Sequence, residues 1–166
     1  GQRSFTPRHF EYKFKELKVL HGEEEYRVRG QIDRIDIDPV TGKALVVDYK
    51  LSPRADSLRK KLSKDLELQL PLYLLAVRRL LNLDVVGAEL RFLTSATSEG
   101  VYLDSARQAL GLGARAKTFG ADEFEKMLEK AEILVRDYAQ RLKSGTIAVN
   151  SKSCKYCRYS AVCRFE

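Results

Sequence analysis

The first third of the chain alternates between apolar and polar residues, which predicts strands that bury one face. Residues 21–24 and 38–43 hold the Gly and Pro residues typical of turns. After the second turn, residues 44–50 are almost continuously apolar and rich in Val, which predicts a strand in the middle of a sheet. The residues at every second position, expected on one face of each strand, are Phe10, Tyr12 and Phe14 in one stretch, and Tyr26, Val28, Gly30 and Ile32 in the next.

The rest of the chain shows helical spacing over about residues 65–81 and 121–143, with strands expected over 88–94 and 100–103. Pro71 requires the first helix to begin close to it or to kink there. These elements predict an α/β fold with a central mixed sheet flanked by helices, formed by residues 1–166 as a single domain. The helix positions expected to face the core are Leu66, Leu70, Tyr73, Leu74, Val77 and Leu81, and then Phe124, Leu128, Ala131, Val135, Tyr138 and Leu142.

Candidate chemistry is concentrated in the hairpin formed by residues 30–50. If its turn is centred between Val40 and Thr41, facing residues have numbers that sum to 81, and Asp33 lies opposite Asp48. Lys50 lies two residues beyond Asp48 and shares its face of the strand. The register therefore predicts two carboxylates and an ammonium group side by side.

Two carboxylates so close repel each other unless a cation lies between them. A hard divalent ion, Mg²⁺ or Mn²⁺, is the expected occupant because it takes oxygen ligands, and the backbone carbonyl of Tyr49 can add one. Such an ion activates water and polarises a phosphoryl group, while Lys50 would orient the water or offset negative charge. The competing interpretation is an acidic hairpin with a solvated lysine. The burial expected of Asp48 counts against it, because an unpaired buried carboxylate is costly.

Charge adds a weaker indication. The net charge of +7 favours a polyanionic partner. Phosphates that pass basic side chains after the acidic strand would give salt-dependent, sequence-independent affinity, although each such side chain alone is equally consistent with a solvated face. The basic residues concerned are Arg54, Arg59, Lys60, Lys61 and Lys64, with Lys152, Lys155, Arg158 and Arg164 near the cysteines.

Three cysteines, Cys154, Cys157 and Cys163, lie in the tail formed by residues 150–166. An odd number argues against a closed disulfide framework. Their crowding indicates metal or cluster ligation in a reducing compartment, so a cytoplasmic location is expected. No apolar run approaches the ~20 residues of a membrane span, and no membrane partner is expected.

Three segments in order resemble the motifs of the PD-(D/E)XK nuclease superfamily, specifically its RecB-like branch. They are GQIDRID at residues 30–36, VDYK at 47–50 and QLPLY at 69–73. The resemblance implies an Mg²⁺-dependent deoxyribonuclease in which Asp33 and Asp48 bind the metal and Lys50 completes the catalytic core. It gives Gln69 and Tyr73, which share a helix face, DNA-contacting or site-supporting roles. Packing alone is the alternative for Tyr73.

The cysteine tail resembles the last three ligands of the iron–sulfur nucleases in this branch, and most of all the AddB family of helicase–nuclease subunits. The RecB-like nucleases of CRISPR adaptation come next. The resemblance implies a [4Fe–4S] cluster, an exonuclease of DNA recombination and repair acting on single-stranded DNA, and a helicase partner that is separate or fused.

The chain departs from this pattern in two ways. No cysteine precedes Cys154, so a fourth cluster ligand has to come from outside these residues. The family also carries a His or Glu on an upstream helix, for which His9 and Glu11 are weak candidates. Since the chain begins at Gly1 rather than Met, truncation is the expected explanation, and such a fragment would hold metal poorly.

Two functions of other classes compete with this interpretation. A DNA-binding or docking module with the same fold and no activity would be expected to have lost the acidic residues or the lysine, yet all three are present. A small zinc-binding adaptor would need a histidine close to the cysteines, whereas His9 and His21 are far away in the sequence.

Overall fold

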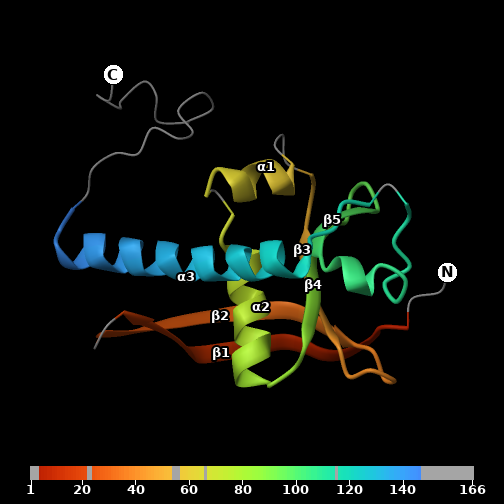
Figure 1. Cartoon of the computed structure of the whole chain (residues 1–166), viewed down its shortest axis with the longest axis horizontal. Coiled ribbons are helices and arrows are strands. Elements are labelled where there is room, and N and C mark those ends of the chain that lie inside the picture. Colours follow the sequence, from red (N-terminus) through yellow and green to blue (C-terminus); the bar gives the residue numbers. More distant parts are fainter. Residues whose placement is uncertain (1–3, 22–23, 54–56, 66, 115, 147–166) are drawn as a thin grey trace.

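The computed structural model describes residues 4–21, 24–53, 57–65, 67–114 and 116–146. Over these residues five strands form one sheet in the order β1-β2-β3-β4-β5 (Figure 1). The elements are β1 (Thr6–His21), β2 (Glu24–Ile37), β3 (Ala44–Lys50), α1 (Leu58–Ser63), α2 (Gln69–Leu80), β4 (Val85–Phe92), β5 (Thr97–Tyr102), η1 (Asp104–Ala106) and α3 (Ala121–Lys143).

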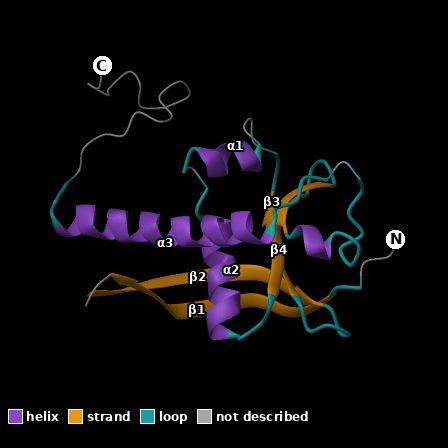
Figure 2. Ribbon diagram, viewed as in Figure 1, coloured by secondary structure: helices purple, strands orange, loops and turns teal. Residues whose placement is uncertain are grey.

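The sheet is mixed, because β3 and β4 run parallel whereas the other neighbouring strands are antiparallel. Helices flank it, as Figure 2 shows. The predicted α/β fold is therefore confirmed. None of the described helices is long and apolar enough to cross a membrane.

Strand β3 has the predicted bounds and lies third of the five strands. Its first five residues are all buried. Ala44 and Val46 belong to the large core that includes α2, and Leu45 and Val47 to a smaller cluster with Phe5 and residues 102–110 on the other face. Burial on both faces explains why this strand shows no alternation.

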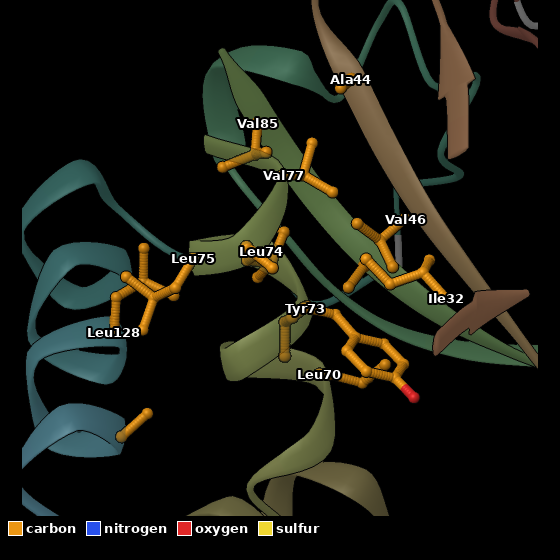
Figure 3. Packing of buried hydrophobic residues seen from close by; sticks show 14 of the residues in the cluster. Ile32, Ala44, Val46, Leu70, Tyr73, Leu74, Leu75, Val77, Val85 and Leu128 are labelled. Atoms are coloured by element: carbon orange, nitrogen blue, oxygen red, sulfur yellow. The ribbon is translucent and has the colours of Figure 1, made fainter. Parts of the chain in front are cut away.

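Helix α2 begins at Gln69, later than predicted. Pro71 consequently lies in the first turn, where a missing N–H costs no hydrogen bond within the helix. Figure 3 shows the side chains of Leu70, Tyr73, Leu74 and Val77 between α2 and the strands of the sheet. Leu66, also predicted to face the core, lies outside the described residues.

Helix α3 has the predicted bounds; Ser144 is its C-cap, and Gly145 follows with a positive φ of 66°. Its predicted buried stripe is correct only in the first half. Phe124, Leu128 and Ala131 are buried, whereas Tyr138 and Leu142 are 42% and 79% exposed, so that part of the prediction is wrong. The physical reason is the way the two helices cross: α2 lies across the first half of α3, and the second half of α3 extends beyond it (Figure 1).

Other differences concern boundaries. Strands β4 and β5 each begin three residues before the predicted position. The basic segment after β3 contains the short helix α1, which Ser57 caps by accepting from the backbone N–H of Lys60. Its six residues are too few to show helical periodicity.

Candidate active site

The β2–β3 hairpin adopts the predicted register. Arg34 pairs with Val47 and Asp36 with Leu45, so facing residues sum to 81. At the turn, the Asp38 side chain accepts from the backbone N–H of Val40, and its own N–H donates to the carbonyl of Lys43 at 2.9 Å. The register that underlies the predicted acidic pair is therefore confirmed.

The strands separate at the acidic pair itself. The paired ladder stops at Arg34 and Val47, one position before Asp33 and Asp48. Asp33 Oδ2 accepts the backbone N–H of Tyr49 at 2.8 Å. The Asp33 carboxylate thus accepts the N–H group that would continue the ladder. This hydrogen bond joins β2 to β3 where the two strands diverge at Asp33 and Asp48, a place that we call the fork.

Asp48 ends the buried part of β3 and is only 2% exposed. Its Oδ2 faces Lys50 Nζ at 2.6 Å, and its Oδ1 accepts from Gln69 Nε2 at 3.2 Å. Burial raises the pKa of this carboxyl above its usual value. The charges of Asp33 and Glu67 raise the pKa further, and Lys50 opposes the shift.

Gln69 connects the sheet to α2. Its Oε1 accepts from Lys50 Nζ at 3.0 Å, while its Nε2 donates to Asp48 and, at 2.9 Å, to the hydroxyl of Tyr73. Gln69 is the first residue of α2 and Tyr73 lies one turn further on, so the spacing of four residues brings both to the site. A single amide thereby fixes the carboxylate and the ammonium group together.

Tyr73 is packed in the core and also reaches Gln69. Its ring packs edge-on against Phe14 with centroids 6.2 Å apart, and the residue is 9% exposed. Its hydroxyl reaches Gln69, and burial raises its pKa. Gly30 provides space for this pair, since a Cβ there would lie 2.7 Å from Phe14 Cζ and 3.5 Å from Tyr73 Cε1.

Glu67 is a site residue that the sequence reasoning missed. Its Oε1 accepts from the backbone N–H groups of Gln69 and Leu70 at 3.0 and 3.3 Å. Glu67 therefore caps α2, where a negative charge is favourable, and it adds a third negative charge near Asp48. The detectable signal was an acidic residue just before the helix that carries Gln69.

The basic residues predicted to contact DNA phosphates lie in different surroundings. Lys61 of α1 lines a pocket of about 20 Å³, roughly one water molecule in size, together with Lys50, Glu67 and Gln69. Arg59 is turned toward α3, where it pairs with Glu123 at 3.2 Å and packs over the ring of Phe119. Lys60 and Lys64 are exposed on or beside α1. Arg54 and the basic residues of the tail lie outside the described residues.

The weak candidates for an upstream metal ligand are on β1. His9 packs edge-on against Tyr12, and Glu11, with a φ of 51°, accepts a hydrogen bond from the Gln31 amide. In the part of the chain that the structure describes, no three His, Cys, Asp or Glu side chains gather closely enough to hold a metal ion. Cys154, Cys157 and Cys163 lie outside the described residues.

The donors at the fork nevertheless fit a hard cation. Asp48 Oδ2 is buried and, among the described residues, meets only the Lys50 ammonium group. Asp33 uses Oδ2 for Tyr49, and its other oxygen accepts no hydrogen bond from described residues. The three carboxylates of Asp33, Asp48 and Glu67 outnumber the ammonium groups of Lys50 and Lys61, and a divalent ion with oxygen ligands would offset the remaining negative charge.

Comparison with known proteins shows the family of the chain. A family model of the PD-(D/E)XK nuclease superfamily matches residues 1–164. The chain therefore belongs to that superfamily.

Individual proteins similar to the chain include two helicase–nuclease subunits and one solved structure. The chain is 28% identical over 180 residues to an ATP-dependent helicase/deoxyribonuclease subunit of Lactococcus lactis subsp. cremoris (strain SK11). It is 29% identical over the same length to the exonuclease/helicase subunit RexB of strain MG1363. Each match covers 84% of this chain and 16% of the relative, so the chain spans about a sixth of their length. Among solved structures, SSO0001 aligns over 94% of this chain and 59% of its own, with a TM-score of 0.41 and 16% identity.

Proposed function

We propose that this chain is the Mg²⁺- or Mn²⁺-dependent deoxyribonuclease domain of an AddB-type helicase–nuclease subunit. The observation that carries the proposal is the joint placement of Asp48 and Lys50 by Gln69, with Asp33 at the fork beside them. The proposal draws support from the superfamily assignment and from relatives whose names describe a helicase–nuclease subunit.

In this proposal Asp33 and Asp48 hold the metal ion, and the backbone carbonyl of Tyr49 adds a ligand. When bound, such an ion supplies Lewis-acid chemistry that polarises a phosphodiester and activates water. Two carboxylates are a typical protein share for Mg²⁺, which keeps several waters and takes further oxygens from substrate phosphates. The raised pKa of Asp48 is the signature of a carboxylate kept out of water, and a nearby cation would favour its ionised form.

Lys50 provides the positive charge for the reacting phosphate. Its Nζ lies 2.6 Å from Asp48 and 3.0 Å from the Gln69 amide oxygen. Both contacts hold the ammonium group at one place, so no reorganisation is needed when negative charge develops on the phosphoryl oxygens. Gln69 and Tyr73 act as positioning residues for Lys50 and Asp48.

Lys61, with Arg59 and Lys60 on the same short helix, is proposed to guide the phosphates of a single DNA strand to the site. Lys61 reaches the pocket that Lys50 lines, whereas Arg59 would have to leave Glu123 to contact DNA. Contacts of this kind weaken with rising salt and do not read sequence. A helicase that is a separate subunit or part of the same longer protein would supply the strand.

Cleavage of labelled single-stranded DNA by the longer parent protein tests this proposal. Cleavage should require Mg²⁺ or Mn²⁺, and Asp48→Ala should abolish it, whereas the exposed control Asp122→Ala on α3 should leave it unchanged. Metal-dependent cleavage retained in Asp48→Ala would overturn the proposal. DNA binding with no cleavage in the unaltered protein would favour an inactive docking module.

We also propose that Cys154, Cys157 and Cys163 supply three of the four ligands of a [4Fe–4S] cluster in the longer protein. The spacing and number of these residues in the sequence support this proposal. Analysis of the purified parent for iron, acid-labile sulfide and zinc tests it. Four irons and four sulfides are expected for each chain, whereas zinc without sulfide would contradict it.

A further inference from the structure

The carboxyl end of β3, which carries Asp48 and Lys50 on one face of the sheet, carries Tyr49 on the opposite face. Because successive side chains of a strand point to opposite sides, Tyr49 points away from Asp48 and Lys50. Beside Tyr49 a hollow of about 440 Å³ opens at the carboxyl ends of β3 and β4. This volume lies within the range of small-ligand pockets. The hollow is lined by Tyr49, Arg91, Phe92, Leu93, Ala96, Thr97 and Ser98. Phe92 and Thr97 pair in the row of Lys50, so the hollow reaches the edge of the other face.

Three of these residues form one row across the sheet. Tyr49 pairs with Arg91 in the parallel β3–β4 ladder, and Arg91 pairs with Ser98 in the antiparallel β4–β5 ladder. Residues at paired positions share a face. The row therefore presents an aromatic ring, a guanidinium group and a hydroxyl next to one another.

Arg91 is anchored through its Nε atom, whereas its two terminal nitrogens are available to a ligand. Its Nε donates to the fully buried Glu89 carboxylate at 2.6 Å, and the Arg91 side chain is 31% exposed. Tyr102 donates to the second oxygen of Glu89 at 3.0 Å. The two terminal nitrogens of Arg91 form no hydrogen bond with described residues, so a fixed fork of N–H groups faces the hollow, and this geometry suits a phosphate.

Tyr49 is held as firmly. The guanidinium of Arg34 packs over its ring at 5.6 Å and donates to its hydroxyl at 2.6 Å, and Arg34 itself pairs with the buried Asp36 at 2.8 Å. Tyr49 remains 36% exposed. An aromatic side chain fixed at an exposed edge beside an open arginine combines the features with which proteins bind single-stranded nucleic acid.

We propose that this hollow is a single-stranded DNA subsite that holds one nucleotide next to the cleavage position. Tyr49 stacks on the base, and Arg91, with the Ser98 hydroxyl, contacts the phosphate. The subsite rests on the proposed nuclease function, because the strand that crosses this edge of β3 and β4 reaches Lys50 and Asp48 on the other face. It also requires flexible single-stranded DNA, since duplex DNA could not bend around the end of a single β-strand.

Binding of a fluorescein-labelled oligothymidylate to the chain in EDTA, followed by fluorescence anisotropy, tests the subsite without cleavage. Tyr49→Leu should weaken binding by about tenfold, while Tyr49→Phe, which keeps the ring, should stay within about twofold. Ser98→Asp places a carboxylate beside Arg91 and should weaken binding by about fivefold or more. Far-UV circular dichroism checks that each variant is folded.

The matched control is Gln140→Glu, which adds the same charge on an exposed position of α3 and should leave binding unchanged. Equal binding by Tyr49→Leu, Ser98→Asp and the unaltered chain would overturn the subsite, as would the absence of any oligothymidylate binding. Equal losses in Ser98→Asp and Gln140→Glu would also overturn it, because only overall charge would then matter. Failure of the nuclease proposal would look different: DNA binding would persist while metal-dependent cleavage would be missing.

Discussion

The Asp48–Lys50 pair makes a specific prediction about stability in the absence of metal. Asp48 is buried, and Lys50, with a side chain 27% exposed, lies 2.6 Å from it. Lys50→Met removes the ammonium group and leaves the carboxylate with the Gln69 amide as its one donor among the described residues. Asp48→Asn instead removes the charge whose burial is unfavourable. The lysine substitution should therefore be the more damaging of the two, although both are expected to abolish cleavage.

The magnitude follows from the contacts. At 2.6 Å and an effective dielectric constant of about 20, the gross attraction is roughly 6 kcal/mol, and desolvation cancels much of it. Removing one partner of a buried pair typically costs about 3–5 kcal/mol. The partial exposure of Lys50 and the remaining Gln69 contact place Lys50→Met at about 2–3 kcal/mol. Asp48→Asn should change the free energy of unfolding by less than about 1 kcal/mol, and the double variant should resemble it.

Urea unfolding in EDTA at neutral pH, followed by circular dichroism because the chain has no Trp, measures these values. The control is Lys126→Met on the exposed side of α3, which should cost less than about 0.5 kcal/mol. A double-mutant cycle with coupling near zero, or Lys50→Met as mild as Lys126→Met, would refute the reasoning that Lys50 compensates a buried charge.

Three further predictions concern the fold. Burial raises the pKa of Asp36 above its usual value despite the pairing of Asp36 with Arg34. Because the folded state then binds the proton more tightly than the unfolded state, the contribution of Asp36 to stability falls as pH rises through the folded-state pKa. In urea unfolding at a series of pH values, Asp36→Asn should make this fall in stability less steep. If the variant keeps the full slope, this assignment is wrong. Gly87→Ala should cost about 1–3 kcal/mol, because the new Cβ would lie 2.7 Å from the carbonyl oxygen of Val101, whereas Gly113→Ala, with open space around it, should be close to neutral; equal effects would contradict the close packing of β4 on β5. Leu128→Ala in the core should cost about 2–5 kcal/mol and Leu142→Ala under about 0.5 kcal/mol, and similar losses in thermal melts would mean that the end of α3 is covered.

The sequence was sufficient where a single physical rule dominated. The apolar run of residues 44–50 predicted both ends of β3 correctly, and the turn at Asp38 to Lys43 set the register of the β2–β3 hairpin. The period of four residues in QLPLY placed Gln69 and Tyr73 together. These are local patterns with a direct structural consequence.

Features that depend on the assembled fold were not predictable. The departure of β2 from β3 at Asp33 depends on a side chain that captures the N–H of Tyr49. The exposure of Leu142 depends on where α3 crosses α2, which helical spacing does not reveal. The site role of Glu67 was hidden because an acidic residue before a helix is also an ordinary cap.

The central claim is that Asp33 and Asp48 together form the metal site, and direct Mn²⁺ binding tests it without reference to activity. Titration of the chain with Mn²⁺, followed by the electron paramagnetic resonance signal of the free ion, should show one weak site formed by these two carboxylates. Asp33→Asn and Asp48→Asn should each weaken that site by about tenfold or more, and Asp122→Asn should not change it. Unchanged Mn²⁺ affinity in both active-site variants would contradict the account.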